Sequence, residues 1–434
     1  MTRRRRLPLY GLVLAYGISQ LGTVMSGLAI PWLVLVTTGS AARTGLVGFA
    51  EMGAYVITQA FSGPVVDRFG LRRSCVTGNA AAAVCVGAIP ALYAMGALSI
   101  GSLIALVAVA GAVRGAADAA TSPLVPRTAS FGGIPNERAA GLNSVAQRTG
   151  MLAGLPLGGV LIAAAGSPAV VLVDAVTFAV AALLIAAAVP AAATRAADAE
   201  TDVASDTNTG GRLTVRGYLS QIAEGMRFIR ADRLIAGIAL MVAVVNLLDI
   251  ALDSVFIPVW VHTRLHQPAG LGLIGGAMAA GLVIGALAGT WVGHRMPRHA
   301  TYAIGFLVGG CPVFFALAFS PSLVPVMIVA ALGGLGSGTL NPIIGAVVYE
   351  RIPARLQASV LGAFRSSAWI GIPFGALLGG VLAQGIGLRN ALLVTGTAMF
   401  VMTLTPFVFP AWRGLNRQPA PTQAPSDEPD AVAH

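Results

Sequence analysis

Long apolar segments separated by short polar ones run through almost the whole chain. A helix that crosses a bilayer needs about 20 mostly apolar residues, and the pattern provides that length again and again. The first segment is too long for a signal-peptide core and shows no clear cleavage site, so we expect it to be retained. The pattern predicts an all-α membrane protein with twelve spans, at residues 9–36, 45–65, 75–95, 99–121, 141–164, 168–190, 235–261, 270–293, 300–319, 322–347, 357–384 and 389–410.

The polar stretch 191–234 divides the predicted spans into six and six. Its first part is rich in polar and turn-forming residues, which indicates a flexible cytoplasmic linker. In its second part Leu219, Ile222, Met226 and Ile229 recur three or four apart among arginines, which predicts an amphipathic helix on the inner membrane surface. The expected organisation is a six-helix bundle at 1–190, this linker, a second bundle at 235–412 and a disordered cytoplasmic tail at 413–434.

The two halves also resemble each other in sequence. The segment after Ile134-Pro135 recurs after Ile352-Pro353. A duplicated six-helix unit explains this, and such parallel repeats place the substrate path between the halves. A shift of 217 residues superposes Arg148 on Arg365, Gly154 on Gly371, Pro156 on Pro373 and Gly158 on Gly375.

The distribution of charge adds one prediction, the orientation of the chain in the membrane. Only 10% of the residues are charged, and the 27 basic residues, all arginine, outnumber the 17 acidic ones. Most arginines lie in loops on the side of Arg3 to Arg6, whereas only Arg43, Arg264 and Arg389 lie in loops opposite. This asymmetry follows the positive-inside rule and predicts both termini in the cytoplasm of an inner-membrane protein. The net charge of +10 therefore reports topology and not nucleic-acid binding.

Motifs for cofactors, metals and ATP are missing from the sequence. The chain has no lysine and so cannot form the phosphate-binding loop GxxxxGK[ST]. Its three cysteines lack metal-ligand spacing, and His262 and His266 occupy a predicted outer loop beside a proline. We expect no metal, no cofactor and no enzymatic activity, and the energy for transport would come from an ion gradient.

The loop after the second span, GPVVDRFGLRR, carries a spaced set of glycines and charges. Glycines allow a tight turn, the aspartate can face a helix N-terminus, and the arginines can bridge neighbouring helix ends. We predict that the aspartate stabilises the outward-facing state by meeting the start of the eleventh span, near Gln357; the alternative is a generic positive-inside loop. The residues of this motif are Gly63, Asp67, Arg68, Gly70, Arg72 and Arg73.

The fifth span carries a second motif, RTGMLAGLPLGG. Small residues four apart let helix backbones approach closely, and a proline leaves a carbonyl unpaired and bends the helix. We predict that the two halves approach each other here and that Gly158→Leu blocks closure; the alternative is ordinary helix packing. The motif comprises Arg148, Gly150, Gly154, Pro156, Gly158 and Gly159.

Both motifs resemble those of the major facilitator superfamily. The loop matches the family signature except that Leu71 replaces a basic residue, and the fifth-span motif is similar to that of drug/proton antiporters. Further segments (GISQLGT, TGS, PLVP and EGMRF) resemble the branch that contains enterobactin and macrolide exporters. The resemblance implies efflux of small amphipathic molecules by a protein that can work as a monomer.

Ionisable residues inside spans are costly and are therefore candidates for function. By the predicted helix directions, Asp249 lies near mid-membrane, and Glu51, Asp174 and Asp253 lie towards the outside. The remaining in-span charges are expected in the cytoplasmic third: Arg114, Asp118, Arg148 and Arg365.

Two pairs four residues apart share a helix face. For Asp249 and Asp253, repulsion and the low dielectric favour binding of a proton, so we predict Asp249 as the carrier of the coupling proton, Asp253 as its modulator and Glu51 as the next candidate. Hydrogen-bonded structural acids are the alternative. For Arg114 and Asp118 we expect a local ion pair. The resemblance implies an antiporter role for Arg114, although Asp118 stands where the family prefers glycine.

The sequence thus predicts a transporter that exchanges an outgoing amphipathic solute for protons by alternating access. Its partners would be the bilayer, the solute and protons. Proton-coupled uptake on the same fold is one alternative. A membrane sensor or scaffold is another, but the linker is too short to hold a soluble effector domain.

Overall fold

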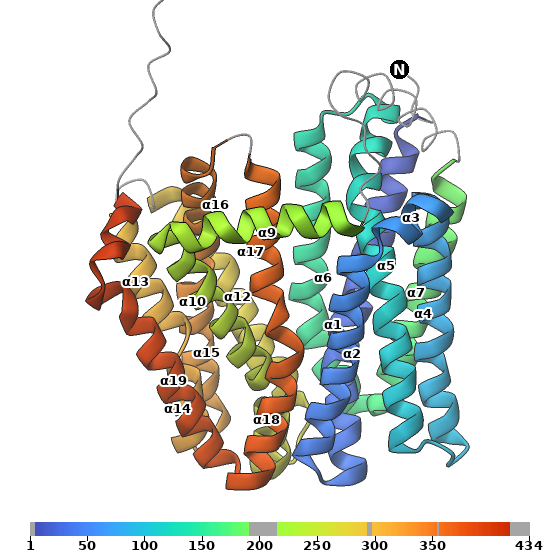
Figure 1. Ribbon diagram of the computed structural model, residues 1–434. Coiled ribbons are helices and arrows are strands. Elements are labelled where there is room, and N and C mark those ends of the chain that lie inside the picture. The colour runs from blue at the N-terminus through green and yellow to red at the C-terminus, as the bar shows by residue number, and fades with distance from the viewer. Residues whose placement is uncertain (1–4, 191–214, 293–296, 354–355, 417–434) are drawn as a thin grey trace, which may run out of the picture.

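The computed structural model describes residues 5–190, 215–292, 297–353 and 356–416, and all regular structure within these ranges is helical. The predicted all-α membrane fold is confirmed. The first part of the predicted linker, 191–214, and the chain beyond residue 416 lie outside the described residues. Figure 1 shows two bundles side by side, one formed by α1 to α7 and the other by α10 to α19.

The first bundle contains six long helices and one short one. Gly39 ends α1 in the left-handed conformation (φ 63°), and Gly70 (φ 83°) separates α3 from α4; glycine adopts both without steric cost. The bounds are α1 Leu7–Thr38, α2 Ala41–Phe61, α3 Gly63–Phe69, α4 Leu71–Ala94, α5 Ile100–Gly132, α6 Asn136–Ala165 and α7 Ser167–Ala188.

Helix α5 is longer than the sequence pattern predicts. The expected end at residue 121 is wrong, because the helix continues through Pro123 and Pro126 to Gly132. Proline usually ends a helix in water. Inside a membrane bundle, neighbouring groups re-satisfy the freed carbonyls, and prolines are tolerated. The middle of α5 therefore lies further along the chain than expected.

The second bundle repeats the arrangement with more interruptions. Its first span runs through two π-helical segments, the first of which ends just before Pro258; such widened turns accommodate local strain and often mark functional sites. The bounds are α10 Arg233–Ala251, η2 Leu252–Phe256, α11 Ile257–Trp260, η3 Val261–Leu265, α12 Ala269–Val292, α13 Arg298–Gly309, α14 Pro312–Phe319, α15 Leu323–Gly338, α16 Leu340–Arg351, α17 Gln357–Ile370, α18 Ile372–Ile386, α19 Leu388–Val408 and the 3-10 helix η5 Pro410–Asn416.

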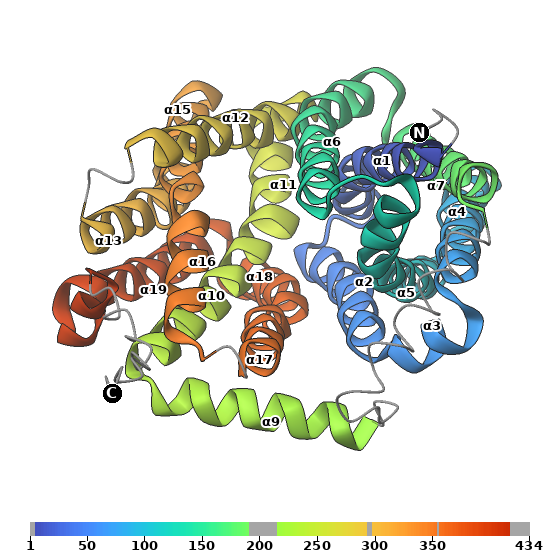
Figure 2. The ribbon, with the colours of Figure 1, turned by 90° about the horizontal axis from the view of Figure 1, so that it is seen from above.

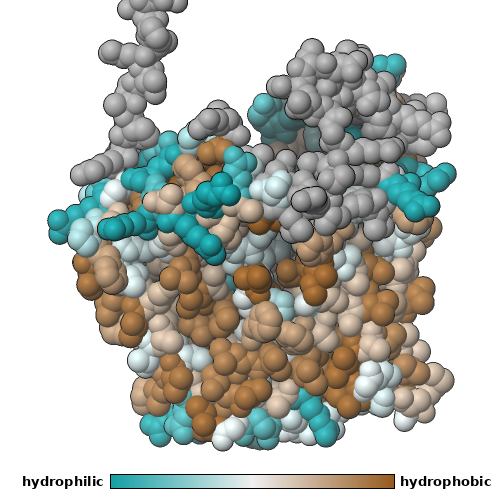
Figure 3. Space-filling model, in the orientation of Figure 1, coloured by the Kyte–Doolittle hydropathy of each residue, from teal (hydrophilic) through white to brown (hydrophobic). Residues whose placement is uncertain are grey.

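An apolar belt crosses the face of the molecule seen in Figure 3. Figure 3 shows hydrophobic side chains around the middle and hydrophilic ones at both ends. Among the described residues, eleven helical stretches are long and apolar enough to cross a bilayer. Helix α2, with 21 residues, carries Arg43 and Glu51 and packs between α5 and α18 as a further column. The chain is therefore a multi-pass membrane protein.

The helix α9 (Val215–Ala231) runs along the outside of the bundles, nearer to one end of the molecule, as Figures 1 and 2 show. The predicted helix is confirmed, and it packs against protein. Gly225 lies against the backbone of Ser359 in α17, and Ile229 is buried in one cluster with Val360. Part of its apolar face therefore contacts protein, and its expected position on the inner membrane surface stays a prediction.

Ion pairs and hydrogen bonds tie the helices together at the α9 end. Arg351 pairs with Asp232 at 3.1 Å and donates to the carbonyl of Gly414 at 3.0 Å. Leu415 in η5 is buried. Ordered structure therefore continues to Asn416, beyond the expected start of the tail at residue 413.

The bundles meet along two seams of small residues, α6 against α12 and α2 against α18. At the first seam, Gly159 lies so close to Gly272 that a Cβ added to Gly159 would be 2.6 Å from the Cα of Gly272. At the second, Gly45 lies against the backbone of Ala376. The shift of 217 residues that relates the repeats converts 159 into 376, and in each seam the fifth span of one bundle packs on the second span of the other, so the seams are pseudo-symmetric copies.

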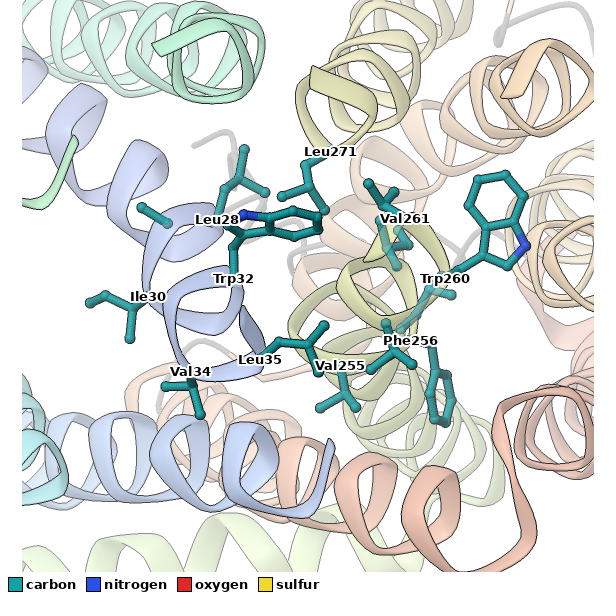
Figure 4. Packing of buried hydrophobic residues seen from close by; sticks show 14 of the residues in the cluster. Leu28, Ile30, Trp32, Val34, Leu35, Val255, Phe256, Trp260, Val261 and Leu271 are labelled. Carbon is teal, nitrogen blue, oxygen red and sulfur yellow. The ribbon is translucent and has the colours of Figure 1, made fainter. Parts of the chain in front are cut away.

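Both seams lie at the end of the molecule opposite α9, near the loops after α1 and η3. Between them, Trp32 of α1 points towards Leu271 and Val261, and Leu35 lies near Val255 (Figure 4). All five side chains are buried. The bundles are thus packed together at this end through a continuous apolar core.

Candidate functional site

Two glycines bring α2 and α5 into close contact. The backbone of Gly111 lies against the carbonyl of Glu51, and that of Gly115 lies against the carbonyl of Tyr55. Small residues allow such close helix packing in membranes. Because each helix repeats its face every four residues, this register aligns Glu51 with Arg114, and Tyr55 with Asp118.

The aligned side chains form a polar cluster inside the first bundle. Arg114 Nη1 lies 3.1 Å from Glu51 Oε1, and the two side chains are only 14% and 18% exposed. The Tyr55 hydroxyl donates to Asp118 Oδ2 at 2.9 Å and accepts from Gln59 Nε2 at 3.2 Å. The cluster thus combines an ion pair with a hydrogen-bonded carboxylate.

Aromatic rings and a further acid surround Arg114. Its guanidinium lies 5.7 Å from the ring centre of Tyr55 and 5.6 Å from that of Phe178, within cation–π range. Asp174 on α7 is buried, 2% exposed, and Thr177 Oγ1 donates to it. Gly22 of α1 lies directly against these two side chains. The cluster therefore draws on helices α1, α2, α5 and α7.

This geometry corrects two expectations about Arg114 and Asp118. They were expected at a different depth from Glu51, but Arg114 is the fifteenth of 33 residues in α5 and Glu51 the eleventh of 21 in α2, so both are central. The error follows from ending α5 at residue 121. The expected Arg114–Asp118 ion pair is also replaced, by Arg114–Glu51 and Asp118–Tyr55.

The acids of the seventh span have a different environment. Asp249 is the seventeenth residue of the 33-residue stretch Arg233–Leu265, which agrees with its expected mid-depth position. It is half-buried, and Asp253, in the π-helix η2, is exposed. Within the described part of the chain, neither carboxylate has a hydrogen bond or an ion pair. The two acids are thus separate from the Glu51–Arg114 cluster in sequence and in partners.

The loop motif holds helix ends together within the first bundle. Arg72 donates to the carbonyls of Val189 at 2.5 Å and Ala186 at 2.7 Å, and so caps the C-terminus of α7. Arg68 and Arg73 are exposed, and the short helix α3 begins at Gly63 and is followed by Gly70. The side chain of Asp67 lies outside the described part of the structure, so its contact near Gln357 stays a prediction.

The glycines of the α6 motif face two different ways. Gly150, Gly154 and Gly158 pack against α1, in their own bundle. Gly159, together with Leu155 and Pro156, contacts α12 of the other bundle. The prediction that Gly158 itself forms the approach between the halves is therefore wrong, because adjacent residues point about 100° apart around a helix. Arg148 is exposed.

One contact across the bundles was not expected from sequence. The rings of Tyr55 in α2 and Trp369 in α17 are stacked with centres 6.4 Å apart, and Phe49 lies 5.6 Å from Phe374 in α18. Tyr55 therefore connects the polar cluster to the second bundle. Aromatic residues six apart in α2 are the only sequence signal for this contact, and they do not identify a partner.

Comparison with known proteins gives a consistent family. The model described as Major Facilitator Superfamily matches residues 12–266 and again 239–433. A protein of Mycobacterium tuberculosis named multidrug efflux pump Tap is 29% identical over 432 residues, 99% of each chain. A pump of that name from Mycolicibacterium fortuitum is 26% identical over 96% of this chain and 99% of its own.

Solved structures show the same fold. The nucleoside transporter NupG has a TM-score of 0.66 at 13% identity and is covered over 99% of its length by 93% of this chain. A bacterial homologue of the human lysosomal transporter Spinster, in an inward-facing and unoccupied conformation, has a TM-score of 0.68 at 15% identity. It is covered over its full length by 97% of this chain.

Proposed function

Because the chain belongs to the Major Facilitator Superfamily, we propose that it is a secondary transporter that exports small amphipathic molecules from the cell. Two relatives that align over almost their whole length are named multidrug efflux pumps. The glycine and proline motif of α6 and the Arg114 cluster support export in exchange for protons. Drugs, antibiotics and siderophore-like compounds belong to the proposed substrate class.

The observation that carries this proposal is the mid-depth polar cluster beside the bundle interface. Ions at this depth are costly unless paired, yet Glu51, Arg114 and Asp118 lie there together. Tyr55 joins the cluster to Trp369 of the other bundle. A change of charge in the cluster can therefore alter the contact between the bundles, as coupled transport requires.

We assign the coupling proton to Asp249, with Asp253 as its modulator and Glu51 as the second candidate. Asp249 is central in its span and lacks an ion partner among the described residues. A protonated acid there costs little to desolvate, whereas an ionised one requires water or a cation. Cationic solutes would then compete with protons for the same carboxylate.

The protein is proposed to lie in the inner membrane as a monomer, with both termini and α9 in the cytoplasm. In this orientation the two seams lie on the outer side, and the described conformation is closed to the outside. The bundles 1–190 and 235–412 would act as the moving domains. Opening of the outer seams and approach of the inner ends would give the alternate state.

Transport of ethidium, a planar cation, into everted membrane vesicles tests this function. Respiration acidifies the lumen of such vesicles, so a proton-coupled exporter concentrates ethidium inside them. Asp249→Asn should abolish uphill accumulation and keep downhill exchange, whereas Asp253→Asn should shift the pH dependence. Accumulation only in right-side-out vesicles would identify an uptake symporter instead. Normal uphill accumulation by Asp249→Asn would move the assignment to Glu51.

A further inference from the structure

A small polar cavity lies inside the first bundle, beside Asp118. Its volume is about 10 Å³, which is room for one water molecule or one small ion. Its polar lining comes from three helices. Tyr16 and Ser19 belong to α1, Asn79 to α4, and Asp118 and Thr121 to α5.

Ser19, Thr121 and Asn79 offer acceptor oxygens to the cavity, and the Tyr16 hydroxyl, which has no hydrogen bond within the described ranges, can donate or accept there. Ser19 Oγ donates to the carbonyl of Tyr16 at 3.2 Å, and Thr121 Oγ1 donates to that of Ala117 at 2.9 Å. Asn79 Nδ2 donates to the carbonyl of Cys75 at 2.8 Å. Cys75 Sγ also lies 3.5 Å from Thr121 Oγ1, and the two hydroxyl oxygens and the amide oxygen each keep a lone pair for another group.

Asp118 adds a carboxylate to these acceptors. Tyr55 occupies one of its oxygens, and Arg114, one turn away, is engaged with Glu51. Within the described ranges Asp118 has no ion pair. An ionised carboxylate at this depth requires water or a compensating positive charge. A water molecule can offer only two donors to the four acceptors, whereas a cation interacts with all of them.

We propose that this cavity binds a sodium-sized monovalent cation. Carboxylate, amide and hydroxyl oxygens are hard ligands that suit such ions. Glu51 and Arg114 pair with each other, and Asp174 lies on α7 outside the cavity lining, so one positive charge in the cavity compensates the carboxylate of Asp118. The ion joins α1, α4 and α5 and fixes Asp118, and with it Tyr55 and the contact to Trp369. This site is independent of the proposed direction of transport and of the solute.

Thermal unfolding of the purified protein in detergent tests the site without any transport. At constant ionic strength and pH, replacing choline chloride by sodium chloride should raise Tm in a saturable manner, since a ligand that binds only the folded state stabilises it. Asp118→Asn should remove this shift. Thr121→Val, which preserves shape but removes one oxygen, should weaken the sodium affinity at least tenfold.

Thr128→Val is the matched control. Thr128 is also buried in α5 and also donates to the carbonyl four residues earlier, Leu124, but it does not line the cavity. Its sodium response should equal that of the unmodified protein. Equal Tm values in sodium and choline would overturn the proposal, as would an unchanged sodium response in Thr121→Val. A rise in Tm on acidification without any sodium effect would assign a proton to Asp118 instead.

Discussion

Substitution of Gly159 by alanine should open the seams between the bundles at the end of the molecule opposite α9. The new Cβ would lie 2.6 Å from both the Cα and the amide nitrogen of Gly272, and a normal contact needs about 3.4 to 4 Å. The obstructing atoms are backbone, so no side chain can move aside. The seam between α6 and α12 must therefore separate by about 1 Å or more.

The overlap of the new Cβ with the backbone of Gly272 raises the free energy of the closed conformation alone. Overpacking in a well-packed region costs about 1–3 kcal/mol, and this penalty falls only on the conformation in which the seam is closed. At about 1.4 kcal/mol per factor of ten, a penalty of about 2 kcal/mol lowers the ratio of closed to open molecules about 30-fold. If the transport cycle passes through the conformation with closed seams, the transport rate should fall correspondingly.

Cross-linking at the other seam measures this ratio. Ser40 Oγ and Gln384 Oε1 lie 3.2 Å apart across α2 and α18. In a background in which the three native cysteines are replaced, Ser40→Cys with Gln384→Cys should react with a short bifunctional thiol reagent. Gly159→Ala should slow this reaction strongly, because the bundles separate as rigid bodies.

Gly158→Ala is the control on the neighbouring residue. A Cβ there would lie 3.2 Å from the Cα of Met25 in α1, and within 4 Å its nearest atoms all belong to the first bundle. The cross-linking rate should stay at the level of the unmodified protein. Equal rates in Gly159→Ala and the unmodified protein would show that the seam does not limit closure.

Three further substitutions test ties described above. Glu51→Gln leaves Arg114 without its ion partner, and we expect it to lower the free energy of unfolding by about 3 kcal/mol. Adding Arg114→Gln to the same chain should restore part of that loss. An unchanged Tm in Glu51→Gln would exclude a structural role for the pair. Arg72→Ala removes two hydrogen bonds to the end of α7 and should lower the free energy of unfolding by about 2 kcal/mol, whereas Arg73→Ala, at an exposed position, should have little effect. Arg351→Ala should free η5, seen as faster amide hydrogen exchange in residues 410–416, and unchanged exchange there would contradict the tie.

Much of the fold could be predicted because lipid imposes a simple rule. Only closed backbone structures cross a bilayer, so apolar length identifies the spans, and the recurrence of Pro156 as Pro373 identifies the duplication. The residues at which helices end were harder to predict from the sequence. Pro123 and Pro126 resemble helix stops, but a membrane bundle tolerates them, and the end of α5 was placed eleven residues too early.

The candidate site could be predicted as a set of residues but not as a set of contacts. Glu51, Arg114 and Asp118 were identified because ionisable groups in lipid are rare. Their pairing depends on how α2 and α5 slide along each other, which Gly111 and Gly115 determine. Helix periodicity describes one helix at a time and contains no information on that register. The same limitation concealed which face of α6 meets α12.

The pseudo-symmetric seams have a consequence for the origin of the protein. In each seam the fifth span of one bundle contacts the second span of the other, as at Gly159 with Gly272 and Ala376 with Gly45. This is the geometry of a self-complementary twofold dimer, in which every contact occurs twice. An ancestral unit of six helices could therefore pair with itself through a single surface patch. Fusion of two copies would retain that patch while freeing each copy to diverge, and the Glu51–Arg114 pair now stands in the first copy and Asp249 with Asp253 in the second.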